Sequence, residues 1–238
     1  MENENLYNVY SEERTGLLVG KLMQKTYLWM TFGLIITALT ALYVAGNKSM
    51  LMAIFSSSTT YFILIIAELF LVGFLAARIH KLSLPVATVM FMAYSALNGA
   101  TLSILLLHYA PEVIATTFFV TAGTFAAMSL VGFVVKRDLS AGGKFLMVCL
   151  FGIIIATVVN MFMHSPMLHM LISYVGVVVF AGLTAYDTQK LRLMFEAAGD
   201  DMTETHQKMA LLGSLTLYLD FINLFLFLLR IFGGGNDD

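Results

Sequence analysis

Long apolar runs separated by short polar links dominate this chain. Each run has about the 17 to 25 residues that a helix needs to cross roughly 30 Å of hydrocarbon. The pattern predicts an all-α, polytopic membrane protein, a bundle of seven transmembrane helices. The predicted spans are Tyr27–Ala45, Tyr61–Ala77, Leu84–Leu107, Val113–Val135, Phe145–Met163, Leu168–Tyr186 and Met209–Phe232. An alternative has six spans, with the last segment re-entrant.

The polar segments around these runs divide the chain into three parts. Residues 1–26 form a polar leader, residues 27–232 a single seven-helix membrane domain, and residues 233–238 a Gly-rich tail that we expect to be flexible. The longest polar link, Thr188–Lys208, carries mixed charge. It is expected to be a solvated loop with helical shoulders.

Composition and charge support a membrane location. Hydrophobic residues make up 59% of the chain, charged residues only 12%, and the mean hydropathy is +0.86. Of 13 Lys and Arg residues, all but Lys48 and Arg230 fall on one side if the N-terminus is cytoplasmic. This asymmetry follows the positive-inside rule and predicts that orientation. The net charge is -2 and the basic residues are scattered, so the sequence predicts no basic surface for binding nucleic acid.

Two carboxyl groups interrupt apolar runs. Asp220 lies in the middle of LTLYLDFINLFLFLLR, where Asn223 and Phe227 share its helical face. Glu68 lies in AELFLVGFLAAR, and Arg78 ends that run. Isolated carboxylates are costly in hydrocarbon, so both acids are candidate site residues that must face protein or water. Arg78 and Arg230, near span ends, could instead reach the interface with no further role.

The motifs AYDTQKL, after the sixth run, and LYLDFINLFLFLLR, in the seventh, resemble the paired signatures of the Bax inhibitor family. The similarity covers nearly the whole chain. It implies seven helices around a central last helix, no enzymatic activity, and a pH-sensitive calcium leak. Calcium ions and protons are then the partners within a lipid bilayer, and no resident cofactor is expected. The short leader favours the bacterial cytoplasmic membrane, and an endoplasmic reticulum or Golgi location stays open.

The resemblance also implies residue roles. Asp187 and Asp220 correspond to a carboxylate pair that senses protons, and Arg78 to an arginine that latches the pair in the closed state. Glu68 and Arg230 stand where relatives use a charged pair, and Asn223 is a further candidate for the ion pathway. Two neighbouring carboxyls cannot both ionise cheaply at low dielectric, so they would share a proton. When charged, Asp187 and Asp220 could also hold calcium transiently.

Residue spacing alone does not predict that the two aspartates meet. Asp187 directly follows the sixth run, whereas Asp220 lies about eleven residues into the seventh, roughly 16 Å at the rise of a helix. Contact would require tilt, a broken helix or a water-filled vestibule. The pairing is therefore an expectation from the resemblance.

Other functions remain open at this point. One bacterial branch of the family resembles modulators of a membrane-anchored protease, so a regulator that binds membrane proteins through the leader is the main alternative. Half of an intramembrane aspartyl protease is a weaker one, because Asp220 has no adjacent glycines to open the backbone. A retinal-binding protein is excluded, because the seventh run has no lysine. The oligomeric state stays open.

Overall fold

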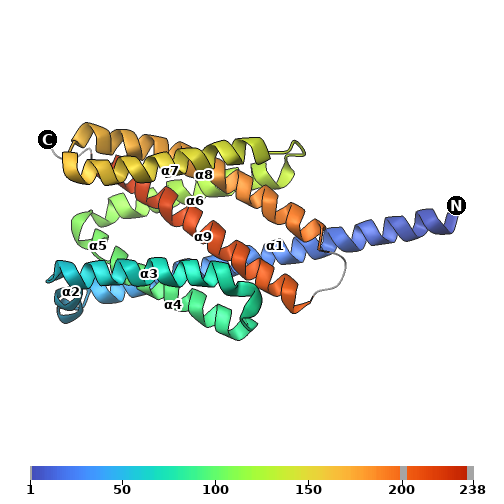
Figure 1. Ribbon diagram of the computed structural model, residues 1–238, viewed down its shortest axis with the longest axis horizontal. Coiled ribbons are helices and arrows are strands. Elements are labelled where there is room, and N and C mark those ends of the chain that lie inside the picture. The colour runs from blue at the N-terminus through green and yellow to red at the C-terminus, as the bar shows by residue number, and fades with distance from the viewer. Residues whose placement is uncertain (1, 199–202, 235–238) are drawn as a thin grey trace. The chain divides into compact units, whose positions relative to one another are not determined.

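The structure, a computed structural model, describes residues 2–198 and 203–234, with side chains from Arg14 onward (Figure 1). Within these ranges the chain is helical and forms no strand. Seven helices are long and apolar enough to cross a membrane. They are α1 (Glu2–Ala45), α3 (Ser58–Arg78), α4 (Leu84–Leu102) continued by α5 (Leu105–His108), α6 (Pro111–Val134), α7 (Ser140–Met163), α8 (Pro166–Glu196) and α9 (Glu204–Gly233). The predicted all-α architecture with seven spans is confirmed.

The helices extend beyond the predicted spans, mainly into the polar segments next to the apolar runs. Helix α1 begins at Glu2, so the predicted leader is the first part of a helix that continues into the span. Helix α8 runs on to Glu196 and α9 starts at Glu204, so much of the expected loop is helical. Polar residues that follow an apolar run can continue its backbone hydrogen bonding, which hydropathy does not report. Residues 235–238 of the expected tail lie outside the described part.

Two short helices were not predicted. Helix α2 (Lys48–Phe55) fills the link after α1, and a 3-10 turn, η1 (Ile79–Lys81), follows α3. Asn47 caps α2, because its side-chain oxygen accepts hydrogen bonds from the backbone N–H groups of Ser49 and Met50. The signal for α2 was therefore the Asn just before it.

The helices form two compact units. The first comprises Met1–His108 and Leu193–Tyr218, and the second comprises Tyr109–Arg192 and Leu219–Asp238. Helices α8 and α9 contribute to both. The two candidate aspartates, Asp187 and Asp220, belong to the second unit, whereas Glu68 and Arg78 belong to the first.

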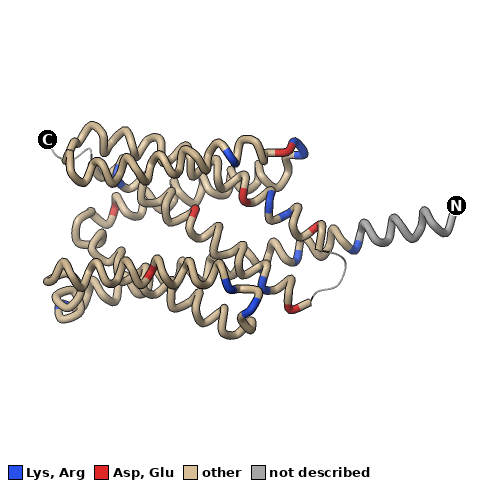
Figure 2. Tube along the Cα trace, viewed as in Figure 1, with Lys and Arg blue, Asp and Glu red and all other residues tan. Residues whose placement is uncertain are grey.

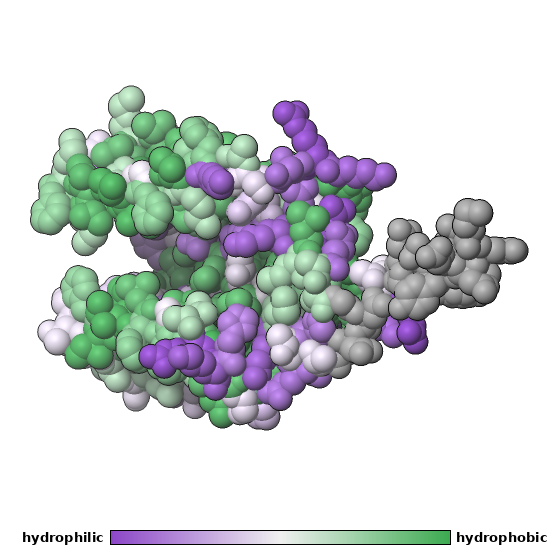
Figure 3. All heavy atoms as spheres, turned by 45° about the vertical axis from the view of Figure 1, so that its right-hand side comes forward, coloured by the Kyte–Doolittle hydropathy of each residue, from purple (hydrophilic) through white to green (hydrophobic). Residues whose placement is uncertain are grey.

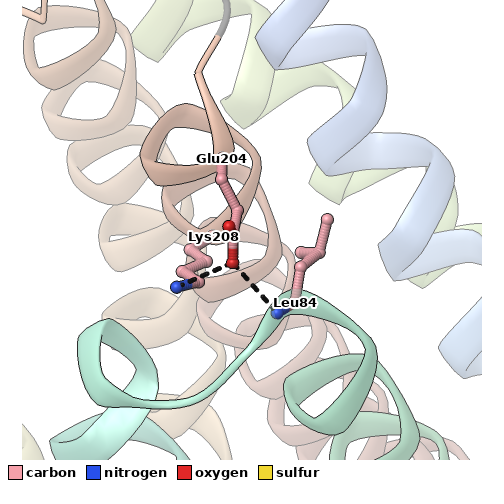
Figure 4. Close-up of polar contacts among 3 residues, drawn as sticks. All are labelled: Leu84, Glu204 and Lys208. Carbon is pink, nitrogen blue, oxygen red and sulfur yellow. Dashed lines mark hydrogen bonds and ion pairs between the residues drawn. The ribbon is translucent and has the colours of Figure 1, made fainter.

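In the first unit, α4 packs against α1 and α3 (Figure 1). The close approach of α4 to α1 requires a glycine at position 99. A Cβ atom on Gly99 would lie 2.4 Å from the carbonyl oxygen of Thr37. The start of α9 docks on the start of α4, where Glu204 accepts a 3.4 Å hydrogen bond from the Leu84 N–H and pairs with Lys208 at 3.0 Å (Figure 4). The first half of α9 is thereby fixed within this unit.

In the second unit, α8 approaches both α6 and α7. A Cβ atom on Gly132 of α6 would lie 2.1 Å from the carbonyl oxygen of Ala185, and one on Gly143 of α7 would lie 2.3 Å from the ring of Tyr186. Phe221 of α9 makes edge contacts with two rings of α6, those of Phe118 and Phe125. These contacts surround the part of α8 that carries Asp187.

The outer faces of the spans are apolar. Large side chains such as Phe70, Val148 and Phe162 are 70%, 69% and 81% exposed. Apolar surface of this kind, green in Figure 3, is stable against lipid tails and costly against water. Charged residues are sparse along the spans and gather near their ends (Figure 2). Helix α9 has the most enclosed span, 56% buried against 39% or less elsewhere, in agreement with a central last helix.

Candidate functional site

The second unit brings together the two aspartates. Because α8 continues without a break to Glu196, Asp187 lies inside the helix rather than at its end. Asp220 lies about midway along α9. Both side chains are buried, with 6% and 5% of their surface exposed. The extension of α8 to Glu196 leaves the distance of Asp187 from the start of that helix unchanged, so the depth difference inferred from the apolar runs stays a prediction.

The carboxyl groups of Asp187 and Asp220 lie close enough to each other to form a hydrogen bond. A carboxylate has no proton to donate, so this bond requires one of the two groups to be protonated. Oδ2 of Asp220 is buried and accepts no hydrogen bond from the described groups. Two full charges at this separation would repel strongly in a site closed to water. A single proton shared by the two acids would remove this repulsion.

Two further polar residues of α8, Lys190 and Gln189, lie near the pair. Lys190 is exposed, and its charge attracts Asp187 one turn earlier on the helix. Gln189 is buried and binds the link between α6 and α7 at both ends of its carboxamide. Its Nε2 donates to the carbonyls of Val135 (3.0 Å) and Arg137 (2.9 Å), and its Oε1 accepts from the Leu139 N–H at 2.8 Å.

A second polar cluster lies in the first unit around Glu68. This carboxyl is 8% exposed. Thr101 donates a short hydrogen bond to Oε1 of Glu68, and Nδ2 of Asn98 donates to Oε2 at 3.4 Å. Both partners come from α4. Glu68 is thus a buried acid with neutral hydrogen-bond donors, as expected for an intramembrane carboxyl with a specific partner set.

Tyr218 of α9 extends this cluster to α1. Its hydroxyl donates to Oδ1 of Asn98 at 3.1 Å and lies 2.6 Å from the Thr37 hydroxyl, with which it shares a hydrogen bond. The Tyr218 ring is fully buried and meets the rings of Phe91 and Tyr94 edge-on. One continuous network therefore joins α1, α3, α4 and α9.

Sequence reasoning missed Tyr218 and Gln189, although both lie inside the two signature motifs. Tyr218 lies two residues before Asp220, and Gln189 lies two residues after Asp187. The available signal was a polar atom in an otherwise apolar segment, which has to find a partner inside the protein. The partners themselves lie 50 or more residues away along the chain.

The remaining candidates have more local surroundings. Asn223 donates to the Leu219 carbonyl of its own helix at 2.8 Å. Arg230 is half-buried and lies over the Phe227 ring, 5.4 Å from its centroid, one turn earlier on α9. Arg78 is exposed at the end of α3. Its role as a latch, and the roles of Asn223 and Arg230 in an ion pathway, stay predictions.

A permanent metal centre has no support in the described ranges. No group of three or more His, Cys, Asp or Glu side chains comes together there to hold a metal ion. Calcium takes six to eight oxygen ligands. Asp187 and Asp220 could contribute only carboxylate oxygens to such a set and would need water or carbonyl oxygens for the rest. A transient calcium ion at the pair stays a prediction.

Comparison with known proteins gives the family. Residues 19–237 match the family described as "Inhibitor of apoptosis-promoting Bax1". The chain is 51% identical to the "Inner membrane protein YbhL" of Escherichia coli K12 over 211 residues, 89% of this chain and 90% of the relative. It is 42% identical to an uncharacterised protein of Borreliella burgdorferi, over 98% of this chain and the full relative, and 33% identical to an uncharacterised membrane protein of Streptococcus pyogenes, over 96% and 98%. With its seven membrane-spanning helices and both signature motifs, the chain belongs to the Bax inhibitor family of integral membrane proteins.

Proposed function

We propose that the protein is a calcium-permeable leak channel of the bacterial cytoplasmic membrane, with its N-terminus in the cytoplasm. The pair of Asp187 and Asp220 is its proton sensor, and Arg78 is the predicted latch. The protein has no enzymatic role in this proposal. Calcium passes through it down its gradient and is not bound as a cofactor.

The observation that carries the proposal is the buried pair of neighbouring aspartates. Its proton count sets the charge of the site. With both carboxyls ionised, the site attracts cations and can hold an arginine by charge-assisted hydrogen bonds. With a proton bound, that attraction weakens and the helices it held are free to move. Falling pH is therefore expected to increase flux.

The test measures calcium entry into proteoliposomes over a pH series from about 5 to about 8. Wild type is compared with Asp187→Asn and Asp220→Asn, which keep the size of each side chain and remove its titration. We expect both variants to conduct with a flattened pH profile. Glu112→Gln is the matched control, because Glu112 is an exposed acid of the same unit.

The outcomes separate the leak from its gate. Conduction with an unchanged pH profile in both aspartate variants would refute the pair as the sensor. Absence of calcium entry in wild type at every pH would refute the leak itself. A change of profile in the Glu112→Gln control would show that the effect of the other two substitutions is not specific to the pair.

One observation favours the regulator as a second candidate function. Helix α1 has 44 residues, about 66 Å at 1.5 Å per residue, which is about twice the thickness of the hydrocarbon core. Part of it extends beyond the membrane and could contact another membrane protein, such as a membrane-anchored protease. Deleting residues 2–13 should then abolish co-purification with that partner and keep calcium flux. Unchanged co-purification would count against this role.

A further inference from the structure

The end of the second unit where α6 gives way to α7 carries a dense group of basic side chains. We define the basic patch as Lys136 and Arg137 of the link, Lys144 of α7 and Lys190 of α8. All four residues are exposed. Figure 2 shows blue segments gathered where α6 ends, α7 begins and the later part of α8 runs. Asp138 is the acidic residue of this link.

Backbone hydrogen bonds hold the link in place. Gln189 binds the carbonyls of Val135 and Arg137 and the N–H of Leu139. Arg192 adds a 2.7 Å hydrogen bond from Nη1 to the Phe133 carbonyl. Hydrogen bonds from α8 therefore already order the backbone that carries Lys136 and Arg137. Little further backbone entropy is lost when a ligand binds there.

Helices α7 and α8, which carry Lys144 and Lys190, meet at the Tyr186 ring. Gly143 packs directly on the Tyr186 ring, and the ammonium of Lys190 lies over the same ring, 5.9 Å from its centroid. Lys144 follows Gly143 and its charge acts on Asp138. Asp138 in turn accepts the Ser140 N–H at 2.8 Å, so its charge is partly engaged at the start of α7. The patch keeps a net positive charge.

The patch lies at the level where spans end. Helix α6 ends at Val134 and α7 begins at Ser140, and both are membrane spans. Next to the cations, Val134 and Phe145 are 61% and 67% exposed. Apolar side chains beside fixed cations at a span end match an anionic phospholipid, whose tails need apolar surface and whose phosphate needs positive charge. A soluble acidic partner would leave the apolar side chains unmatched.

We propose that the basic patch binds the phosphate of an anionic phospholipid, with the acyl chains against the exposed apolar side chains of α6 and α7. The side chains of the patch supply the positive charge that holds the phosphate, and the N–H groups of Leu139 and Ser140 are already bonded to Gln189 and Asp138. The site belongs to the second unit alone and does not depend on calcium permeation.

The test uses delipidated full-length protein in detergent and measures the binding of phosphatidylglycerol and of phosphatidylcholine with the same acyl chains, by native mass spectrometry. Wild type is expected to prefer phosphatidylglycerol. The variant K136Q/R137Q/K144Q leaves Lys190 in place, so that the charge acting on Asp187 is kept. It should lose about tenfold or more of this preference, and added salt should weaken wild-type binding.

The control variant K21Q/K48Q/K81Q removes the same charge from the first unit and should keep the preference. Melting of each variant without lipid checks folding, and the double variant R137Q/K144Q replaces the triple variant if that does not fold. The proposal is overturned if wild type does not discriminate between the two lipids, or if the triple or double variant binds as wild type does. It is also overturned if inorganic phosphate raises the melting temperature as much as phosphatidylglycerol, since the headgroup alone would then explain the site.

Discussion

Replacing Tyr218 with Phe tests the network that ties α9 to the first unit. The substitution removes only the hydroxyl, which contacts Thr37 at 2.6 Å and Asn98 at 3.1 Å. The ring contacts with Phe91 and Tyr94 remain. The change therefore isolates hydrogen bonding between helices from packing.

The size of the effect follows from these two hydrogen bonds. Hydrogen bonds between helices in membranes contribute about 0.6 kcal/mol on average and up to about 1.7. Two of them give about 1 to 3 kcal/mol, and the upper part of this range applies because Asn98 Oδ1 loses a donor in a buried site. We expect Tyr218→Phe to lower the free energy of unfolding by that amount.

The assay is equilibrium unfolding of purified protein in mixed detergent micelles with increasing sodium dodecyl sulfate. Tyr43→Phe is the matched control, because Tyr43 is 63% exposed and should tolerate the change. A double-mutant cycle with Thr37→Val should give a coupling energy of about 0.5 kcal/mol or more. A loss below about 0.3 kcal/mol for Tyr218→Phe, or no coupling to Thr37, would refute the reasoning.

Two further predictions concern the second unit. Gly132→Ala places a Cβ within 2.1 Å of the Ala185 carbonyl and should cost about 1 to 3 kcal/mol of unfolding free energy, whereas Gly123→Ala on the same helix meets no atom within 4 Å and should be neutral or slightly stabilising; the same unfolding assay compares them, and equal stabilities would contradict the close contact. Hydrogen bonds from the Ser140 side chain and N–H lower the pKa of Asp138. Because the folded-state pKa is depressed, this stabilisation is present above the unfolded-state pKa and is lost as pH falls through the folded-state pKa. Asp138→Asn should therefore be less stable than wild type at neutral pH, with the difference vanishing in acid, and a constant difference across pH would contradict this.

The spans were predictable because hydrocarbon imposes a length and an apolar composition on every crossing helix. Their apolar parts were located to within a few residues. The polar continuation of α1 was not predicted, and those of α8 and α9 were predicted only as helical shoulders of a loop, since hydropathy detects the membrane and does not detect helical backbone outside it. For the same reason the apolar run placed Asp187 at the end of a span, whereas α8 continues to Glu196.

The candidate site was only partly predictable. Asp187, Asp220 and Glu68 stand out as charges in or beside apolar runs, so their cost alone singled them out. Their partners depend on which helix faces lie together, and spacing along a chain holds no such information for Tyr218 or Gln189. The contact between Asp187 and Asp220 was expected only because of the resemblance. Small residues at four-residue spacing are common in membrane helices, so Gly132 could not be singled out in advance.

The division of α9 between two compact units has a consequence for biosynthesis. The first unit needs the segment Leu193–Tyr218, which the ribosome makes almost last. Until that segment enters the bilayer, Asn98, which donates to Glu68, lacks the hydrogen bond that its Oδ1 accepts from the Tyr218 hydroxyl. The early spans are therefore in the membrane for much of translation before this hydrogen-bond network is complete. In a chain that lacks the last helix, this incomplete polar network would stay in the membrane. Quality-control proteases could recognise an unfinished protein by it.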